Sequence, residues 1–544
     1  MSDPITLSLR RVQASTFTLV CLALVVMDLL PCIPALLAAE THRALILTPP
    51  APDAPRVNGP NVFGVRPGSP FLYTIPATGK VPLEYAAAGL PAGLKVDVRT
   101  GRITGILKDQ GTHTVTLGAR NSLGLSKKAF KIVVGDQIAL APPMGWSSWN
   151  CWGPSVSQEK VLSSARAMVE KGLQAHGWNY VNVDDGWQKD RGGKFNAIQP
   201  NSKFPDMAAL GAELHSMGFK FGIYSSPWGG TYAGFIGSSS DNKDGTYEWI
   251  KSGDHTEFYR IGKEEELPRP KRVSIRKFGN YPFVTNDVAQ WSEWGVDYLK
   301  YDWHPIDVPH VEEMTDALRN SDRDIVYSLS NGADFKNGKD YEKLSNLWRT
   351  TGDIKDDWNR VKDIGFSQDK WAAHSGPGHW NDPDMMVLGW LGIDEGVHAT
   401  RLTPDEQYTH MSLWCLLSAP LLLGCDLARL DDFTLSLLTN DEVLAIDQDA
   451  LGKQATRVNG KGDLAVYAKT LEDGSMAVGL FNLSPDEATV TARWKDLQID
   501  ENQKLVVRDL WRQKDQGTFT GTFEAKVASH GVVLVKLTVA KPKP

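Results

Sequence analysis

The sequence predicts a multidomain chain in which a (β/α)8 TIM barrel lies between an N-terminal β-sandwich and a C-terminal antiparallel β-domain. Between about residues 138 and 450, short apolar runs alternate with longer helical patterns, as in repeated βα units. Residues 55–137 and 451–544 instead carry short alternating strands separated by turns, which is typical of β-sandwiches. The length of 544 residues is enough for about three or four domains.

The N-terminus reads as a signal peptide over residues 1–39, followed by a linker over 40–54. Arg10 and Arg11 form the basic start, an apolar run follows, and small residues end the segment. The alternative, a membrane anchor, is disfavoured because the apolar run is short and Asp28 interrupts it. We therefore expect an exported protein (periplasmic, cell-surface or secreted) with no transmembrane span in the mature chain.

Charge and composition argue against several kinds of ligand and site. The net charge of −7 argues against nucleic acid as a partner, because phosphate binding needs a basic face. After removal of the signal peptide, Cys151, Cys415 and Cys425 remain at wide spacing, which predicts neither a disulfide framework nor a metal site. The 18 Trp could stack on sugar rings, although most Trp in any protein lie in the core. The oligomeric state cannot be inferred from these features.

Acidic and aromatic side chains follow the predicted barrel strands. Asp184 and Asp185 come after one apolar run, and Asp302 and Asp353 end two others. The eight candidate strands end near Trp149, Asp185, Ser225, Asp302, Ser330, Asp353, Asp384 and Asp426. In this fold the C-terminal ends of the strands converge on the active site, so these acids are expected to face one another.

Three interpretations compete for this acidic cluster: a metal site, an ion-pair network and carboxylate chemistry. No HxH or HExxH pattern accompanies the acids, which disfavours a metal. Ion pairing explains lone acids such as Asp356 and Asp357, but explains poorly why so many acids follow strand ends beside Trp residues. Glycosidases need two carboxylates in a pocket that fits a sugar, and this interpretation uses most of the features.

Six ordered motifs in the barrel region resemble those of the family 27 α-galactosidases. They are MGWSSWN (144–150), VDDGW (183–187), YLKYD (298–302), WRTTGD (348–353), GHWNDPDM (378–385) and APLLLGCDL (419–427). The resemblance runs from about Leu140 to Gln454 and continues into the C-terminal β-domain. Separately, residues 89–105 resemble immunoglobulin-like modules of bacterial secreted enzymes, with a spacer or packing role as the favoured interpretation.

The resemblance implies a retaining mechanism. Asp302 matches the nucleophile and Asp353 matches the general acid/base, so Asp353 should start protonated while Asp302 is ionised. Lys300 would hold a sugar hydroxyl and keep Asp302 ionised, and Arg349 would grip hydroxyls near C2 and C3. No metal and no organic cofactor is implied, because two acids and water complete the chemistry.

The resemblance also implies how the sugar is recognised. Asp184 and Asp185 match the pair that accepts hydrogen bonds from the 4- and 6-hydroxyls of galactose. Trp149 matches the stacking face, with Tyr224 beside it, and Asp384 either lines the pocket or supports the rim. The expected ligand is an α-galactoside oligosaccharide or polysaccharide.

Two departures from the family pattern leave the sugar open. Ser330 stands where galactosidases usually place a Glu, and the small residues of this loop resemble the N-acetylgalactosaminidase branch. An insertion at about 238–281 could wall the pocket and add subsites, or could be a packing flap. An α-N-acetylgalactosaminidase, a β-L-arabinopyranosidase, an enzyme active on isomalto-oligosaccharides and a carbohydrate-binding protein without activity therefore remain as alternatives.

Overall fold

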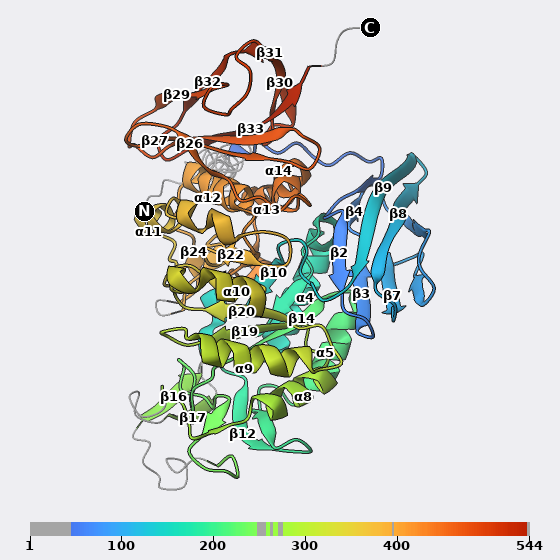
Figure 1. Cartoon of the computed structure of the whole chain (residues 1–544), viewed down its shortest axis with the longest axis vertical. Coiled ribbons are helices and arrows are strands. Elements are labelled where there is room, and N and C mark those ends of the chain that lie inside the picture. Colours follow the sequence, from blue (N-terminus) through green and yellow to red (C-terminus); the bar gives the residue numbers. More distant parts are fainter. Residues whose placement is uncertain (1–44, 247–256, 262–264, 270–275, 394–395, 541–544) are drawn as a thin grey trace, which may run out of the picture.

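A computed structural model describes residues 45–246, 257–261, 265–269, 276–393 and 396–540. A central barrel carries an N-terminal β-module on one side and a C-terminal β-domain against one end (Figure 1). This arrangement confirms the predicted fold class. The predicted signal peptide, 1–39, lies outside the described residues, and the domain boundaries stay predictions. None of the described helices is long and apolar enough to cross a membrane.

The N-terminal module packs a four-stranded sheet, in the order β2-β9-β8-β5, against a three-stranded sheet, β3-β7-β6. Alternation drives the packing: in β8, Val115, Leu117 and Ala119 are buried between more exposed neighbours and meet Phe130 and Ile132 of β9. The strands are β1 Arg56–Val57, β2 Val62–Val65, β3 Pro70–Thr74, β4 Ala77–Thr78, β5 Glu84–Ala88, β6 Leu94–Val96, β7 Arg102–Ile106, β8 Gly111–Asn121 and β9 Gly124–Val134.

The barrel has eight parallel strands in the order β22-β21-β20-β19-β14-β11-β10-β25. A parallel bridge between Met386, just after β22, and Leu423 of β25 connects the two ends of this sheet. The strands are β10 Met144–Ser147, β11 Tyr180–Asn182, β14 Lys220–Ser225, β19 Tyr298–Asp302, β20 Val326–Ser330, β21 Leu347–Arg349, β22 Trp380–Asp382 and β25 Leu421–Leu423.

The barrel helices begin at residues that cap them. Asp206, Asp307 and Asp357 each accept a backbone N–H of the first turn, and Thr403 and Glu406 form a capping box at α12. The helices are α3 Trp149–Trp152, α4 Gln158–Glu170, α5 Met207–Ser216, α8 Val284–Trp294, α9 Val308–Arg319, α10 Gly338–Leu344, α11 Trp358–Gly365, α12 Pro404–Leu417, α13 Asp432–Leu438 and α14 Asp441–Asp447. The 3-10 helices are η1 Gly153–Ser155, η2 Leu173–His176, η3 Phe335–Asn337, η4 Asp369–His374 and η5 Leu427–Arg429.

The strand ends differ from the prediction in two places that matter for the site. Strands β14, β19 and β20 end at Ser225, Asp302 and Ser330, as predicted. Trp149, however, starts helix α3 because β10 already ends at Ser147, and Asp353 lies in the loop after β21. That loop position gives Asp353 an exposed side chain, whereas Asp302 stays buried at its strand end.

Irregular segments and hairpins extend the loops that follow the barrel strands. The predicted insertion begins at β15, Ser239–Ser240, which pairs with β18, Tyr281–Pro282. Between them, β16 Glu257–Ile261 and β17 Glu265–Arg269 form an antiparallel hairpin at the lower end of the molecule in Figure 1. Two further hairpins pair β12 Gln188–Gly192 with β13 Ala197–Pro200, and β23 Trp390–Leu391 with β24 His398–Ala399.

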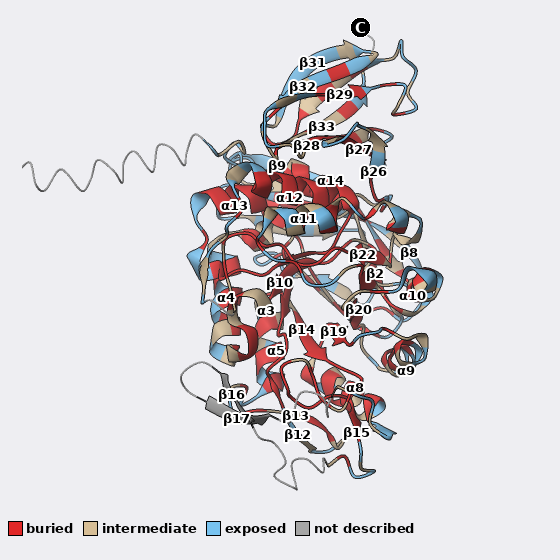
Figure 2. Ribbon diagram, turned by 90° about the vertical axis from the view of Figure 1, so that its left-hand side faces the viewer, coloured by how far each residue is buried: buried red, intermediate tan, exposed pale blue. Residues whose placement is uncertain are grey.

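The C-terminal domain is a six-stranded antiparallel sheet, in the order β26-β27-β28-β33-β30-β31, with the pair β29-β32. Helix α12 lies between this domain and the barrel, and Glu406–Leu417 are buried along it (Figure 2). The strands are β26 Thr456–Asn459, β27 Leu464–Thr470, β28 Met476–Asn482, β29 Ala488–Arg493, β30 Lys504–Asp509, β31 Lys514–Thr520, β32 Thr522–Val527 and β33 Val532–Val539.

Charged contacts attach both β-domains to the barrel. Arg66 of the N-terminal module pairs with Asp324 at 2.7 Å, next to strand β20, and both side chains are mostly buried. At the other domain, Arg508 pairs with Glu442 at 2.7 Å and the Trp511 indole donates to Ser412 at 2.9 Å. These contacts join the two β-domains to parts of the barrel other than the end where the catalytic carboxylates are predicted.

Candidate active site

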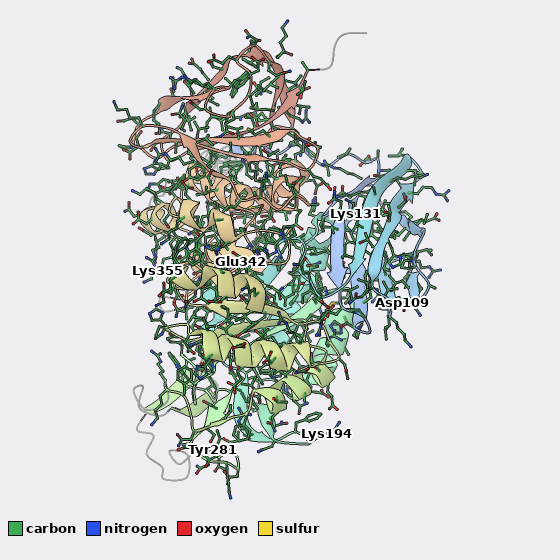
Figure 3. The ribbon with its side chains drawn as sticks, viewed as in Figure 1. Asp109, Lys131, Lys194, Tyr281, Glu342 and Lys355 are labelled. Carbon is green, nitrogen blue, oxygen red and sulfur yellow. The ribbon has the colours of Figure 1, made fainter. Side chains whose placement is uncertain are left out.

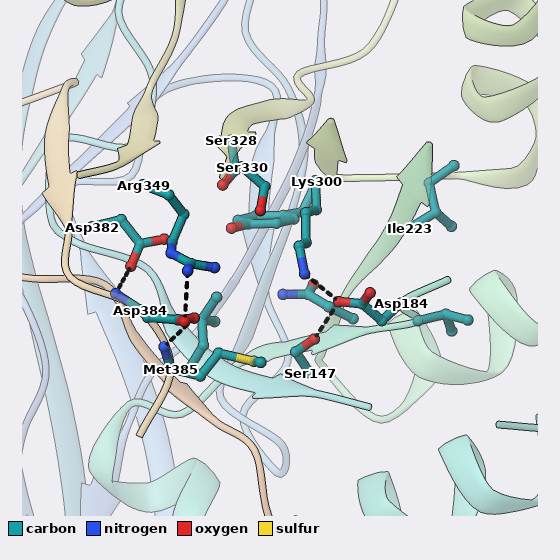
Figure 4. Close-up of a pocket in the computed structure, with 14 residues that line it drawn as sticks. Ser147, Asp184, Ile223, Lys300, Ser328, Ser330, Arg349, Asp382, Asp384 and Met385 are labelled. Carbon is teal, nitrogen blue, oxygen red and sulfur yellow. Dashed lines mark hydrogen bonds and ion pairs between the residues drawn. The ribbon is translucent and has the colours of Figure 1, made fainter. Parts of the chain in front are cut away.

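A cavity at the centre of the barrel forms the floor of the site (Figure 4). All eight barrel strands or the residues directly after them contribute to its lining, and the space between the lining atoms, including the part open to solvent, is about 380 Å³. The lining residues are Ser147, Asn182, Val183, Asp184, Ile223, Tyr298, Lys300, Ser328, Ser330, Arg349, Asp382, Asp384, Met385 and Leu422. Five of the residues predicted for the site, Asp184, Lys300, Ser330, Arg349 and Asp384, are among them.

Asp184 is held by a cation and a hydroxyl on the floor of this cavity. The Lys300 ammonium lies 2.9 Å from Asp184 Oδ2, and Ser147 Oγ donates to the same oxygen at 3.1 Å (Figure 4). The Asp184 backbone N–H donates to Ser148 Oγ at 2.9 Å. Burial lowers the pKa of Lys300, but Asp184 and Asp302 outweigh it and hold that pKa above its usual range. Lys300 is therefore a permanent cation between two carboxylates.

Asp185 is buried beside Asp184 and is fixed by the backbone of a loop. The Ala233 N–H donates to Asp185 Oδ2 at 2.7 Å, whereas Oδ1 has no hydrogen-bond partner among the described residues. Burial raises the pKa of Asp185 to about 7, the Ala233 hydrogen bond opposes this, and Asp184 and Asp302 add to it. A hydrogen bond with the Thr231 side chain also lowers this pKa, so the same loop holds the carboxyl group twice, and Oδ1 remains an acceptor without a partner among the described residues.

Asp302 ends β19 and is only 7% exposed. The Tyr224 hydroxyl donates to Asp302 Oδ2 at 3.0 Å, and Oδ1 has no hydrogen-bond partner in the described part of the chain. Burial raises the pKa of Asp302 to about 6; Lys300 opposes this, Asp353 and Asp184 add to it, and the Tyr224 hydrogen bond lowers it. One oxygen is therefore anchored while the other is available to react.

Arg349 ends β21 and connects two carboxylates that differ in exposure. Its guanidinium lies 2.7 Å from Asp384 Oδ2 and 3.2 Å from Asp353 Oδ1. The Asp384 side chain is 4% exposed and accepts the backbone N–H groups of Ile354 and Met385, whereas the Asp353 side chain is 70% exposed. Asp384 therefore anchors Arg349 on the floor, and Asp353 lies at the mouth.

The pKa values of the two predicted catalytic acids are separated in the direction opposite to the expected one. Partial burial raises the pKa of Asp353, but the charges of Arg349 and Lys300 outweigh it, so the net pKa lies below its ordinary value. The pKa of Asp302 is raised mainly by burial. Its exposure and its pairing with Arg349 favour the ionised form of Asp353, so the expectation that Asp353 starts protonated stays a prediction.

The remaining predicted residues surround this floor. Trp149, at the start of α3, is half-buried. It packs against Ala233 and Phe235 and also against the cluster that contains the cavity-lining residues Tyr298, Met385 and Leu422, although it is not itself among the lining residues. Tyr224 is buried and reaches the site through its hydrogen bond to Asp302. Ser330 lies opposite Asp302 in the register of β19 and β20. The structure thus brings the predicted residues together, while their individual roles stay predictions.

The structure adds residues that the sequence did not single out as site residues. Ser147 and Asn182 line the cavity next to predicted residues. Ser147 belongs to the MGWSSWN motif and Asn182 directly precedes VDDGW, and these positions are the signal that could have identified them. Tyr232 lies near both Asp302 and Asp353, which contribute to its pKa. It belongs to no recognisable motif, so only the structure finds it. No group of three or more His, Cys, Asp or Glu side chains that could hold a metal ion occurs among the described residues.

Comparison with known families gives matches in three parts of the chain. The family model of alpha galactosidase A matches residues 141–249 and 273–449, and that of the alpha galactosidase C-terminal beta sandwich domain matches 461–537. An Ig domain family model matches 54–135. The chain belongs to the α-galactosidase family. The motifs on which the resemblance was based all lie within the first of these matches.

Individual relatives agree with membership of the α-galactosidase family. The α-galactosidase of Cyamopsis tetragonoloba is 36% identical over 74% of this chain and 87% of its own. A candidate α-galactosidase from Bacteroides fragilis has a solved structure with a TM-score of 0.76 and 32% identity, covering 90% of this chain and 98% of its own. A β-L-arabinopyranosidase from Geobacillus stearothermophilus has a TM-score of 0.62 and 28% identity, covering 75% of this chain and 98% of its own.

The two carboxylates on Arg349 should contribute differently to stability. We expect Asp384→Asn to lower the thermal unfolding temperature by the equivalent of about 2–3 kcal/mol, because a buried guanidinium loses its charged partner. Asn tolerates the positive φ of 89° at this position, so the change tests charge rather than backbone strain. The matched change Asp353→Asn should cost less than about 1 kcal/mol, since that side chain is largely exposed. Equal losses in calorimetry would contradict this division of roles.

Proposed function

We propose that this protein is a retaining glycoside hydrolase that releases terminal α-linked galactose, with Asp302 as nucleophile and Asp353 as general acid/base. The observation that carries the proposal is that two carboxyl groups near one cavity differ in burial and in their hydrogen-bond partners. Asp302 is buried with one oxygen anchored by Tyr224 and the other without a partner, and Asp353 lies exposed at the mouth on Arg349. Membership of the α-galactosidase family supports the same activity.

Two displacement steps account for these positions. In the first, an Asp302 oxygen forms a bond to the anomeric carbon while the bond to the leaving oxygen breaks, and Asp353 transfers a proton to that oxygen. In the second, water attacks the anomeric carbon, Asp353 accepts a proton from the water, and the ester bond to Asp302 breaks. Each step inverts the anomeric carbon, so the product retains the α configuration.

Binding of a glycoside would reverse the order of the pKa values of Asp302 and Asp353. A leaving group at the mouth excludes water from the exposed Asp353 side chain, and loss of solvation raises the pKa of a carboxyl group. Lys300 and the Tyr224 hydroxyl meanwhile favour the ionised form of Asp302. Tyr224 and Lys300 therefore act as positioning residues for the nucleophile.

Galactose recognition is assigned to the two neighbouring aspartates. Asp184 Oδ2 is occupied by Lys300 and Ser147, whereas Asp185 Oδ1 has no hydrogen-bond partner among the described residues. A buried acceptor left without a donor costs about 1–3 kcal/mol. The hydroxymethyl group of galactose would supply that donor, whereas a β-L-arabinopyranoside lacks this group.

An assay with three aryl glycosides tests this choice of sugar. We expect kcat/KM for the α-galactoside to exceed that for the β-L-arabinopyranoside by about tenfold or more, the equivalent of one missing hydrogen bond to a buried carboxyl group. In Asp185→Asn the two values should move closer together. A higher kcat/KM for the α-N-acetylgalactosaminide than for the α-galactoside would contradict the proposal. The space beside Ser330 would then decide specificity rather than the pair Asp184 and Asp185.

Changes at the two acids should have different kinetic signatures. We expect Asp302→Ala to lower kcat by about a thousandfold or more on every substrate, because the nucleophile is lost. Asp353→Ala should slow methyl α-galactoside by about 10²–10⁴-fold, since an alkoxide cannot leave without a proton, and should slow a dinitrophenyl galactoside far less. Equal losses of Asp353→Ala on both substrates would refute its assignment as the acid.

The pH profile tests the order of the two pKa values. In the reactive state, Asp302 and Asp353 together carry one proton. This proton is lost as the pH rises through about 6, where Asp302 titrates. We therefore expect kcat/KM to fall as the pH rises through this value. Tyr224→Phe removes a hydrogen bond that favours ionised Asp302, so the basic limb should move to higher pH and the maximum should fall.

Tyr301→Phe is the matched control for this profile. Tyr301 is adjacent to Asp302 in β19, but its side chain points to the opposite face of the strand, so its removal should leave both limbs in place. If Tyr224→Phe moved the acidic limb instead of the basic limb, Asp353 would hold the higher pKa and the order found here would be wrong.

A further inference from the structure

A tight turn between β14 and β15 lies against the sugar-binding aspartates. Thr231 and Phe235 close it, with the Thr231 N–H donating to the Phe235 carbonyl at 2.8 Å and the Phe235 N–H to Thr231 Oγ1 at 3.0 Å. Within it, Ala233 donates its N–H to Asp185, and Ala233 and Phe235 pack on Trp149. Tyr232, the half-buried residue before Ala233, is therefore held beside the galactose pocket.

Residues near the C-terminal end of the insertion hold Tyr232 in place. Arg276 donates to the Tyr232 carbonyl at 2.8 Å, and its guanidinium carbon lies 4.5 Å from the centre of the Tyr232 ring. Trp228 packs on the same ring at 5.3 Å and forms a backbone bridge to Phe278. The C-terminal part of the insertion thus packs on the turn and holds the Tyr232 ring in one position. A flap with only a packing role elsewhere on the surface would not make these contacts.

The Tyr232 hydroxyl lies among groups of the catalytic pocket. Burial raises the pKa of Tyr232 to about 12 and Asp302 adds to this; Arg276 and a hydrogen bond with Asn331 lower it, and Asp353 raises it. The phenol is therefore neutral at any working pH, and can both donate and accept a hydrogen bond. Asn331, which follows Ser330, has a positive φ of 93°, a conformation that turns the chain after β20.

We propose that Tyr232 is a specificity-determining residue that binds the leaving group when that group is a sugar, through a hydrogen bond from its hydroxyl. This inference rests on the proposed function. Asp184 lines the floor and Asp185 is buried beside it, where the galactose is recognised. Asp353 delivers its proton at the mouth, so the leaving group lies on the solvent side. Tyr232 is half-buried and directly precedes Ala233, whose backbone holds Asp185, and its hydroxyl suits a partner that carries hydroxyl groups.

Three substrates separate a contact to the leaving group from a contact to galactose. Melibiose has a glucose leaving group, methyl α-galactoside has an alkoxide of similar basicity without a ring, and α-galactosyl fluoride has no organic leaving group. For Tyr232→Phe we expect kcat/KM to fall by about threefold to tenfold on melibiose, the loss of one hydrogen bond. The values for methyl α-galactoside and for the fluoride should stay unchanged.

Tyr281→Phe is the matched control, because it removes the same kind of hydroxyl from the insertion that packs on Tyr232. Tyr281 is 43% exposed in β18 and lies at the lower edge of the molecule (Figure 3), so this change should leave all three substrates unaffected. The thermal unfolding temperature of each variant checks that it folds.

Two results would overturn the inference. Equal losses on all three substrates would place Tyr232 on the galactose or the nucleophile, and no loss on melibiose would mean that it does not touch the leaving group. Failure of the proposed function would look different, since the unchanged protein would then hydrolyse none of the three substrates.

Discussion

Buried negative charge is the constraint on which the site depends. Five carboxyl groups, Asp184, Asp185, Asp302, Asp382 and Asp384, are buried around one end of the barrel, and only Lys300 and Arg349 among the cavity-lining residues are cations. Because burial disfavours the charged form, it raises the pKa values of most of these groups, to about 7 for Asp185 and about 6 for Asp302 and Asp382. The pKa of Asp384 is also raised, although Arg349 opposes the effect of burial there. Salt bridges on Asp184 and Asp384 fix those two groups and leave Asp302 able to react.

The fold explains how several buried acidic side chains can lie close together. Parallel strands present their carboxyl ends at one edge, so acids from β11, β19 and β22 converge although they are distant in sequence. Backbone N–H groups satisfy several of the oxygens: Ala233 for Asp185, and Ile354 and Met385 for Asp384. The two β-domains bind the barrel elsewhere, through pairs such as Arg66–Asp324 and Arg508–Glu442, and leave the mouth to the loops.

Much of this site was predictable from the sequence, for a physical reason. A barrel strand buried on both faces reads as an apolar run, and the acid that ends it marks the functional edge, as with Asp302 at the end of β19. The place of Trp149 was less predictable, because β10 ends at Ser147 and Trp149 starts α3, where it packs against Ala233 and Phe235 as well as against cavity-lining side chains. The order of the two pKa values also escaped prediction, since it depends on the exposure of Asp353 and on its distance to Arg349. Tyr232 lies in the turn before the insertion, where the sequence has no periodic pattern, and its position follows only from contacts with Arg276 and Trp228.

The central claim is that Asp302 forms a covalent bond to the sugar, and trapping that bond tests it most directly. A 5-fluoro-galactosyl fluoride reacts through its good leaving group, while the electron-withdrawing fluorine slows hydrolysis of the ester that forms. Mass spectrometry of proteolytic peptides then locates the added sugar. We expect a single adduct on the peptide that contains Asp302, and none in Asp302→Ala. An adduct on another carboxylate, or turnover of the reagent without any adduct, would contradict the account.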